Sequence, residues 1–152
     1  MTDIWILSDL HHDFEAFAWP TPPQHDLLVM AGDACDQVSE ALRWVRATAP
    51  TQAPILYVPG NHDAWRCTWP LDLAEARALA ADLDVQLLAD GETYTFNGIR
   101  FIGATLWTDF RLRPDAEETT RTKHDHGDIH DNRWITVSER GDQPWLAADA
   151  IE

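Results

Sequence analysis

Short, continuous runs of apolar residues recur along the first part of the chain. They lie at residues 4–7, 27–30 and 55–58. Runs of this length without a polar interruption are typical of strands that are buried on both faces of a sheet. We therefore expect three buried strands, each followed by a loop at one edge of the sheet.

Helical patterns separate and follow these runs. Apolar residues recur every three or four positions over residues 37–48, which predicts an amphipathic helix with Asp36 as a candidate N-cap. A second helix is expected over residues 70–83, where Pro70 occupies a position tolerated in a first turn and good helix formers follow. Because strands and helices alternate, the sequence predicts an α/β fold with a parallel-rich sheet and flanking helices.

The pattern changes after a further apolar run at residues 85–88. Two alternating runs follow, and they are joined by Asn97 and Gly98, a pair that strongly favours a two-residue hairpin turn. An antiparallel hairpin is therefore expected. The sequence then becomes polar, and residues 111–133 are predicted to form a long loop with at most a short helix before the apolar run at 134–137.

Each of the three buried strands runs into a cluster of polar residues. Asp9 and His11 follow the first strand, Asp33 follows the second, and Asn61 and His62 follow the third. In a parallel sheet these loops emerge at the carboxyl edge, where the ligand sites of α/β proteins lie. Carboxylate and imidazole together suit a divalent cation such as Mn, Fe or Zn. The pattern therefore predicts a metal centre at this edge.

The spacing of the first residues indicates how they share the metal. Asp9 and His11 are two positions apart, so at an extended strand end both side chains point to the same side. Asp33 arrives from the neighbouring strand with two carboxylate oxygens. It can bridge two cations about 3.5 to 4 Å apart, as in two-metal hydrolases.

The third cluster has more polar residues than a turn requires. Pro59, Gly60 and Asn61 suffice to end a strand, so His62 and Asp63 are surplus to that purpose. Asn61 can offer its side-chain oxygen to the second cation, and His62 then stands beside the metals without being needed as a ligand. Asp63 is predicted to orient the His62 imidazole.

The charge of the chain limits the classes of function. Of 152 residues, 11 are Lys or Arg and 26 are Asp or Glu, which gives a formal net charge of −15. This charge opposes non-specific binding to nucleic acid or to an anionic membrane surface. An anionic substrate would need bound cations, since a metal is often the largest local charge in a site. No apolar window approaches a membrane span.

The two cysteines, Cys35 and Cys67, form neither a disulfide framework nor a Cys-x-x-Cys metal pattern, which favours a reducing compartment. The N-terminal residues lack the basic and apolar regions of a signal peptide. We therefore expect a cytoplasmic protein. Its 152 residues, 45% of them hydrophobic, suffice for a single domain with its own core.

Three motifs, D-x-H, G-D-x-x-D and G-N-H-D, follow the three predicted strands in that order. In this arrangement they resemble the calcineurin-like metallophosphoesterase superfamily, over residues 3 to about 110. The resemblance implies the N-terminal part of the αββα sandwich of that family. It also implies hydrolysis of a phosphomonoester or phosphodiester at a binuclear centre of Mn, Fe, Zn or Mg.

The resemblance assigns roles to the candidate residues. It implies that one metal is bound by Asp9, His11 and Asp33, and that the other is bound by Asp33 and Asn61. His62 would protonate the leaving group or steady the transition state, so that His62 and Asn61 would both contact the substrate. The expected substrate is a phosphorylated small molecule or a nucleotide.

The family pattern also includes a further histidine and a Gly-His-x-His motif after later strands, and neither occurs before Glu152. The resemblance therefore implies a domain that is C-terminally truncated relative to the family, with an incomplete second metal site. Two replacements for these ligands remain open. One is the histidine-rich segment with His124, His126 and His130, and the other is a second copy of the chain in a homo-oligomer.

Two functions consequently remain open from the sequence. The first is a metal-dependent phosphoesterase, which the three motifs favour. The second is a truncated, non-catalytic domain that binds metal or phosphate or serves as an interaction module, which the missing ligands favour.

Overall fold

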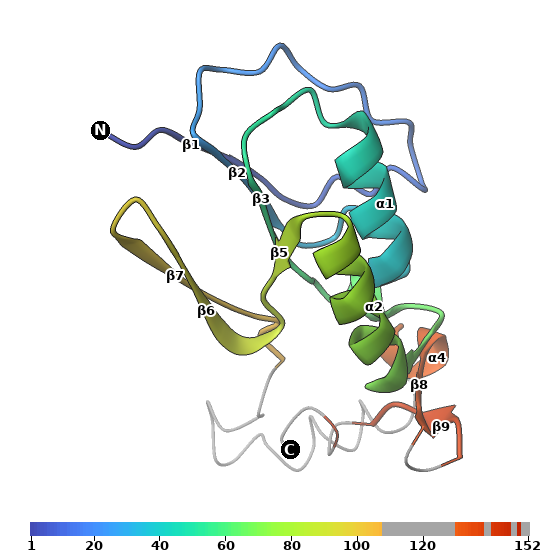
Figure 1. Ribbon diagram of the computed structural model, residues 1–152. Coiled ribbons are helices and arrows are strands. Elements are labelled where there is room, and N and C mark those ends of the chain that lie inside the picture. The colour runs from blue at the N-terminus through green and yellow to red at the C-terminus, as the bar shows by residue number, and fades with distance from the viewer. Residues whose placement is uncertain (108–129, 139–140, 147–148, 150–152) are drawn as a thin grey trace, which may run out of the picture.

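The computed structural model describes residues 1–107, 130–138, 141–146 and 149, and its main feature is a four-stranded parallel sheet. The sheet has the order β1-β2-β3-β5 (Figure 1). Its strands are β1 (Ile4–Leu7), β2 (Leu27–Ala31), β3 (Ile55–Val58) and β5 (Val85–Leu87). The three runs predicted to be buried strands therefore form parallel strands, and the apolar run at 85–88 contributes the fourth.

Both faces of the parallel sheet are covered, which explains why its strands are apolar without alternation. Adjacent residues of a strand point to opposite faces. Leu28 and Met30 of β2 belong to the core beneath the helices, whereas Leu27 and Val29 belong to a second core on the other face. A polar residue at any of these four positions would therefore be buried.

Two helices, α1 (Val38–Thr48) and α2 (Leu71–Asp82), lie side by side on one face of this sheet (Figure 1). The predicted apolar stripe of α1 is buried against the sheet. From α2, Ala76 and Ala80 enter the same core. Both helices thus lie within one or two residues of their predicted bounds.

The opposite face carries the predicted hairpin, formed by β6 (Asp90–Phe96) and β7 (Ile99–Ala104) (Figure 1). Asn97 and Gly98 have φ of 48° and 79°, the left-handed conformation that a tight hairpin turn requires. Aromatic residues of the hairpin pack on the core formed by Leu27, Val29, Leu56 and Leu88.

A second, smaller sheet was not expected from the sequence. It consists of β4 (Cys67–Trp69), β8 (Ile135–Val137) and β9 (Gln143–Pro144), and the short helix α4 (Asp131–Trp134) precedes β8. Of the predicted loop over 111–133, residues up to 129 lie outside the described part, and the last three belong to α4. This sheet packs beside the loop that follows β3, through Trp65, Ile135, Val137 and Trp145.

None of the helices in the described part of the chain has the length and apolarity of a membrane span. Cys35 and Cys67 are both free and buried. Burial raises the pKa of each thiol to about 12. Neither side chain is therefore a thiolate near neutral pH, and both act as small core residues.

Candidate metal centre

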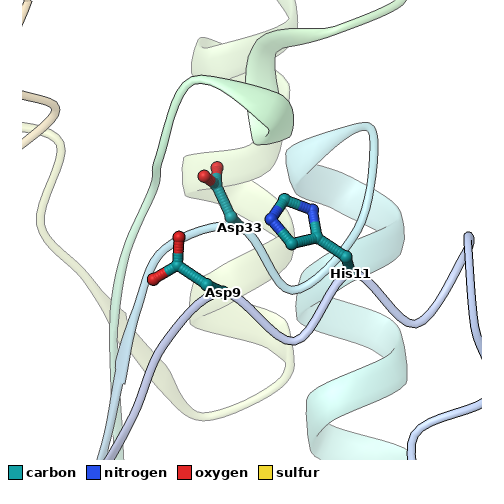
Figure 2. Close-up of side chains that lie close together, drawn as sticks. All are labelled: Asp9, His11 and Asp33. Carbon is teal, nitrogen blue, oxygen red and sulfur yellow. The ribbon is translucent and has the colours of Figure 1, made fainter.

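Asp9, His11 and Asp33 come together at the carboxyl edge of the parallel sheet, in the loops that follow β1 and β2. One potential ligand atom of each residue lies within 4.8 Å of those of the other two. Figure 2 shows the two carboxylates and the imidazole gathered around one point. His11 Nδ1 is buried and has no hydrogen-bond partner in the described structure. Two carboxylates and an imidazole fit a divalent cation.

Asp9 and His11 converge for a different reason from the one predicted. Strand β1 ends at Leu7, and the two residues have φ of 55° and 42°, so neither is extended. Their N–H groups donate to the carbonyls of Gly32 and Asp33 in the adjacent loop, both at 3.0 Å. These bonds hold a left-handed backbone that costs roughly 1–3 kcal/mol at a residue other than glycine.

The loop after β3 fixes the position of Asp33, which itself has a φ of 54°. A Cβ on Gly60 would lie only 2.1 Å from Asp33 Oδ1, so this close packing requires glycine. The backbone N–H of His62 donates to Asp33 Oδ1 at 2.9 Å. Burial raises the pKa of Asp33, and this hydrogen bond opposes the rise. The carboxylate is thus held in place before a metal binds.

Asp63 ties the loops together instead of orienting His62 as predicted. Its side chain is 0% exposed. One carboxylate oxygen accepts the Tyr57 hydroxyl at 2.5 Å, and the other accepts the backbone N–H groups of Asp33 and Gly60, each at 2.8 Å. Both oxygens are therefore engaged away from the imidazole, and Asp63 stabilises the loop that carries Asp33.

The carboxylate that faces His62 is that of Asp36, which the sequence suggested only as a helix cap. Asp36 Oδ1 lies 3.8 Å from His62 Nδ1, and Asp36 Oδ2 lies 3.3 Å from Arg66 Nε. The N-cap of α1 is Gln37, without a side-chain capping bond. Burial and the neighbouring Asp13 raise the pKa of Asp36, whereas Arg66 lowers it. Asp36 is a functional candidate because its carboxylate lies close to the imidazole, although the 3.8 Å separation is too long for a hydrogen bond.

His62 opens the 3₁₀ helix η1 (His62–Ala64), and its ring lies among aromatic rings beside the metal ligands. It stacks on Trp65 with ring centroids 3.6 Å apart and packs edge-on against His11 at 4.5 Å. The structure therefore places the predicted proton donor next to the candidate metal ligand His11.

Asn61 is held by a residue that sequence reasoning missed. Its Nδ2 donates to Asp131 Oδ1 at 3.0 Å, which leaves the amide oxygen available as a ligand. His130 packs against Trp65 at a centroid distance of 6.0 Å and is not part of the Asp9–His11–Asp33 cluster, while His124 and His126 lie outside the described residues. The residues around Asp131 in the sequence do not indicate this contact, because its partners lie far away along the chain.

Asp63 makes the metal-free protein less stable as the pH rises. Burial raises the pKa of Asp63 to about 7 in the folded chain, from an ordinary value of 3.8. Between these values the folded state keeps a proton that the unfolded state has released. The free energy of unfolding therefore falls by up to about 1.4 kcal/mol per pH unit in this window.

The Asp63→Asn variant tests this dependence, since asparagine fills the same space without titrating. Urea unfolding of the metal-free protein at several pH values between 4 and 7 measures it. The variant is expected to show a flatter decline of stability with pH. Parallel curves for the two proteins would contradict the raised pKa of Asp63.

The fold and the site together define an α/β protein with a metal-ligand cluster at the carboxyl edge of a parallel sheet. The model of the family described as calcineurin-like phosphoesterase matches residues 2–150. The chain belongs to this family, and the predicted fold class and resemblance are confirmed.

A solved structure supports the fold independently. The chain is similar to the phosphopantetheinyl hydrolase PptH from Mycobacterium tuberculosis, with a TM-score of 0.61 and 18% identity over 97% of this chain. The chain spans 58% of the length of that protein. No curated protein matches the chain in sequence.

Proposed function

We propose that the protein is a metal-dependent phosphoesterase that hydrolyses a phosphomonoester or a phosphodiester through a binuclear metal centre. The observation that carries this proposal is the cluster of Asp9, His11 and Asp33 within 4.8 Å, with the His62 ring packed against His11. Membership of the calcineurin-like phosphoesterase family supports it. The metals would be two divalent cations drawn from Mn, Fe, Zn and Mg.

The residues of the chain divide into ligands and a proton donor. Asp9 and His11 would hold one cation, Asn61 the other, and Asp33 would bridge them. Bound cations would stabilise the negative charge of the phosphoryl oxygens and lower the pKa of an attacking water. Because Asp36 faces Nδ1 of His62, Nε2 is the nitrogen left to donate a proton to the departing oxygen.

A cavity lies beside Asp36, but its lining includes neither the proposed metal ligands nor His62. Its volume is about 470 Å³, within the usual range for small-molecule sites. Arg43 and Trp44 of α1, and Arg66 from the loop before β4, contribute to its lining. Membership of the calcineurin-like phosphoesterase family supports a phosphorylated substrate, and we propose a phosphorylated small molecule or a nucleotide.

Hydrolysis of a generic aryl phosphate and of a bis-aryl phosphodiester tests the proposal. Purified protein with added Mn²⁺ is expected to cleave at least one of them, and chelation of the metal is expected to abolish turnover. Bound Mn²⁺ without hydrolysis of either compound would instead indicate a non-catalytic metal-binding domain.

A further inference from the structure

We propose that Asp131 is a positioning residue for the second metal, because one of its oxygens fixes both the amide of Asn61 and the indole of Trp65. Asp131 Oδ1 accepts Asn61 Nδ2 at 3.0 Å and Trp65 Nε1 at 2.6 Å. The inference rests on the proposed function in that it takes Asn61 as a metal ligand. It adds a residue outside the Asp9–His11–Asp33 cluster.

The contact with Asn61 determines which end of the amide faces the metal centre. A carboxylate accepts hydrogen bonds but does not donate them, so only the NH₂ group of Asn61 can face Asp131. The amide oxygen, the atom that binds a hard cation, then points away from Asp131. Without this partner the amide group could turn over and present its NH₂ group to the cation.

The contact with Trp65 connects the same carboxylate to the proposed proton donor. Trp65 is buried, and its ring stacks on His62 at 3.6 Å. Because the indole N–H is bound to Asp131, the indole has one preferred orientation beneath the imidazole. Asp131 therefore supports two consecutive functional residues, Asn61 directly and His62 through Trp65.

The small sheet explains how a residue distant in sequence reaches this position. Asp131 opens α4, and β8 directly afterwards pairs in parallel with β4. The N–H of Arg66 donates to the carbonyl of Trp134, which joins α4 to the loop after β3. Asp131 is only 9% exposed, and its two donors offset the cost of burying a carboxylate.

Binding of Mn²⁺ to the full chain, measured by titration calorimetry, tests the inference. Asp131→Leu keeps the branched shape of the side chain but removes the acceptor oxygens, and it is expected to weaken binding of the second Mn²⁺ by about 10- to 100-fold. Asp131→Asn keeps a carbonyl oxygen that can accept both bonds, so its affinity is expected to stay within about threefold of the unmutated chain. Asp82→Leu, which makes the same change at an exposed carboxylate of α2, is the matched control and is expected to retain the second Mn²⁺.

A double variant separates positioning from a general effect on the fold. If Asp131 acts through Asn61, adding Asp131→Leu to Asn61→Ala causes no further loss of Mn²⁺ affinity. The positioning role would be overturned if the double variant lost Mn²⁺ affinity by the full additional factor. It would also be overturned if Asp131→Leu alone left the affinity for the second Mn²⁺ unchanged. If the unmutated chain binds no Mn²⁺, the proposed metal centre itself is wrong, and this inference falls with it.

An NMR measurement on the unmutated chain tests the contact between Asn61 and Asp131 without relying on a variant that must fold. The side-chain NH₂ protons of Asn61 are expected to exchange with solvent more slowly than those of Asn97, which lies in the exposed turn between β6 and β7. Equal exchange rates at the two asparagines would show that Asp131 does not hold the amide, whatever the metal affinity.

Discussion

Replacing Asp33 with asparagine is expected to lower kcat for phosphoester hydrolysis by about 10³-fold, because the variant loses the charge that both proposed cations share. Asp33 belongs to the ligand cluster with Asp9 and His11 and is held by the backbone N–H of His62. Asparagine tolerates the left-handed backbone at this position and keeps an acceptor for that N–H. The loss would therefore report on metal binding and not on a distorted loop.

Steady-state kinetics and metal content, measured on the same preparation, check the Asp33 prediction. Asp82→Ala, which removes an exposed carboxylate from α2, is the matched control and is expected to keep both. Asp33→Asn that retains full metal content and full turnover would contradict the proposed bridging role.

Replacing His62 with alanine is expected to lower kcat by about 10²- to 10⁴-fold for an alkyl phosphate, the range typical of a lost general acid. The loss is expected to be smaller for a nitrophenyl phosphate, whose leaving group needs less protonation. The proposed role of His62 is based on its position beside the metal-ligand cluster, where its ring stacks on Trp65 and its Nδ1 lies 3.8 Å from Asp36 Oδ1. Metal content is expected to stay unchanged, since His62 is not one of the proposed ligands.

His25→Ala provides the comparison for His62, because it removes an imidazole that bonds Pro23 and Thr51 ahead of β2, at the other edge of the sheet. Its kcat is expected to stay near that of the unmutated chain for both substrates. A loss in His62→Ala that is the same for alkyl and nitrophenyl phosphates would argue against protonation of the leaving group.

The parts of the fold that depend on local pattern could be predicted from the sequence. Leu27 and Leu28 are both apolar because adjacent residues of β2 face two different cores. Asn97 and Gly98 adopt the positive φ that their types favour. Helix α1 followed from its apolar spacing, and α2 followed from a run of good helix formers after Pro70. In each case the information lies within a few neighbouring residues.

The parts of the site that depend on distant contacts could not be predicted. Asp63 bonds the Tyr57 hydroxyl and two backbone N–H groups, and this arrangement exists only once the loops after β2 and β3 have packed together. Asp36 reaches His62 from a different loop. Asp131 reaches Asn61 and Trp65 only through the pairing of β8 with β4. Polarity alone does not indicate such partners.

The central claim is that the chain hydrolyses phosphoesters with metal held by Asp9, His11 and Asp33. The most direct test is a titration of the metal-free protein with Mn²⁺. Bound metal and the initial rate of aryl phosphate or diester hydrolysis are measured on the same samples. The account predicts that the rate is absent without metal and rises with occupancy. A rate that is unchanged by metal removal, or full occupancy without turnover of either compound, would contradict it.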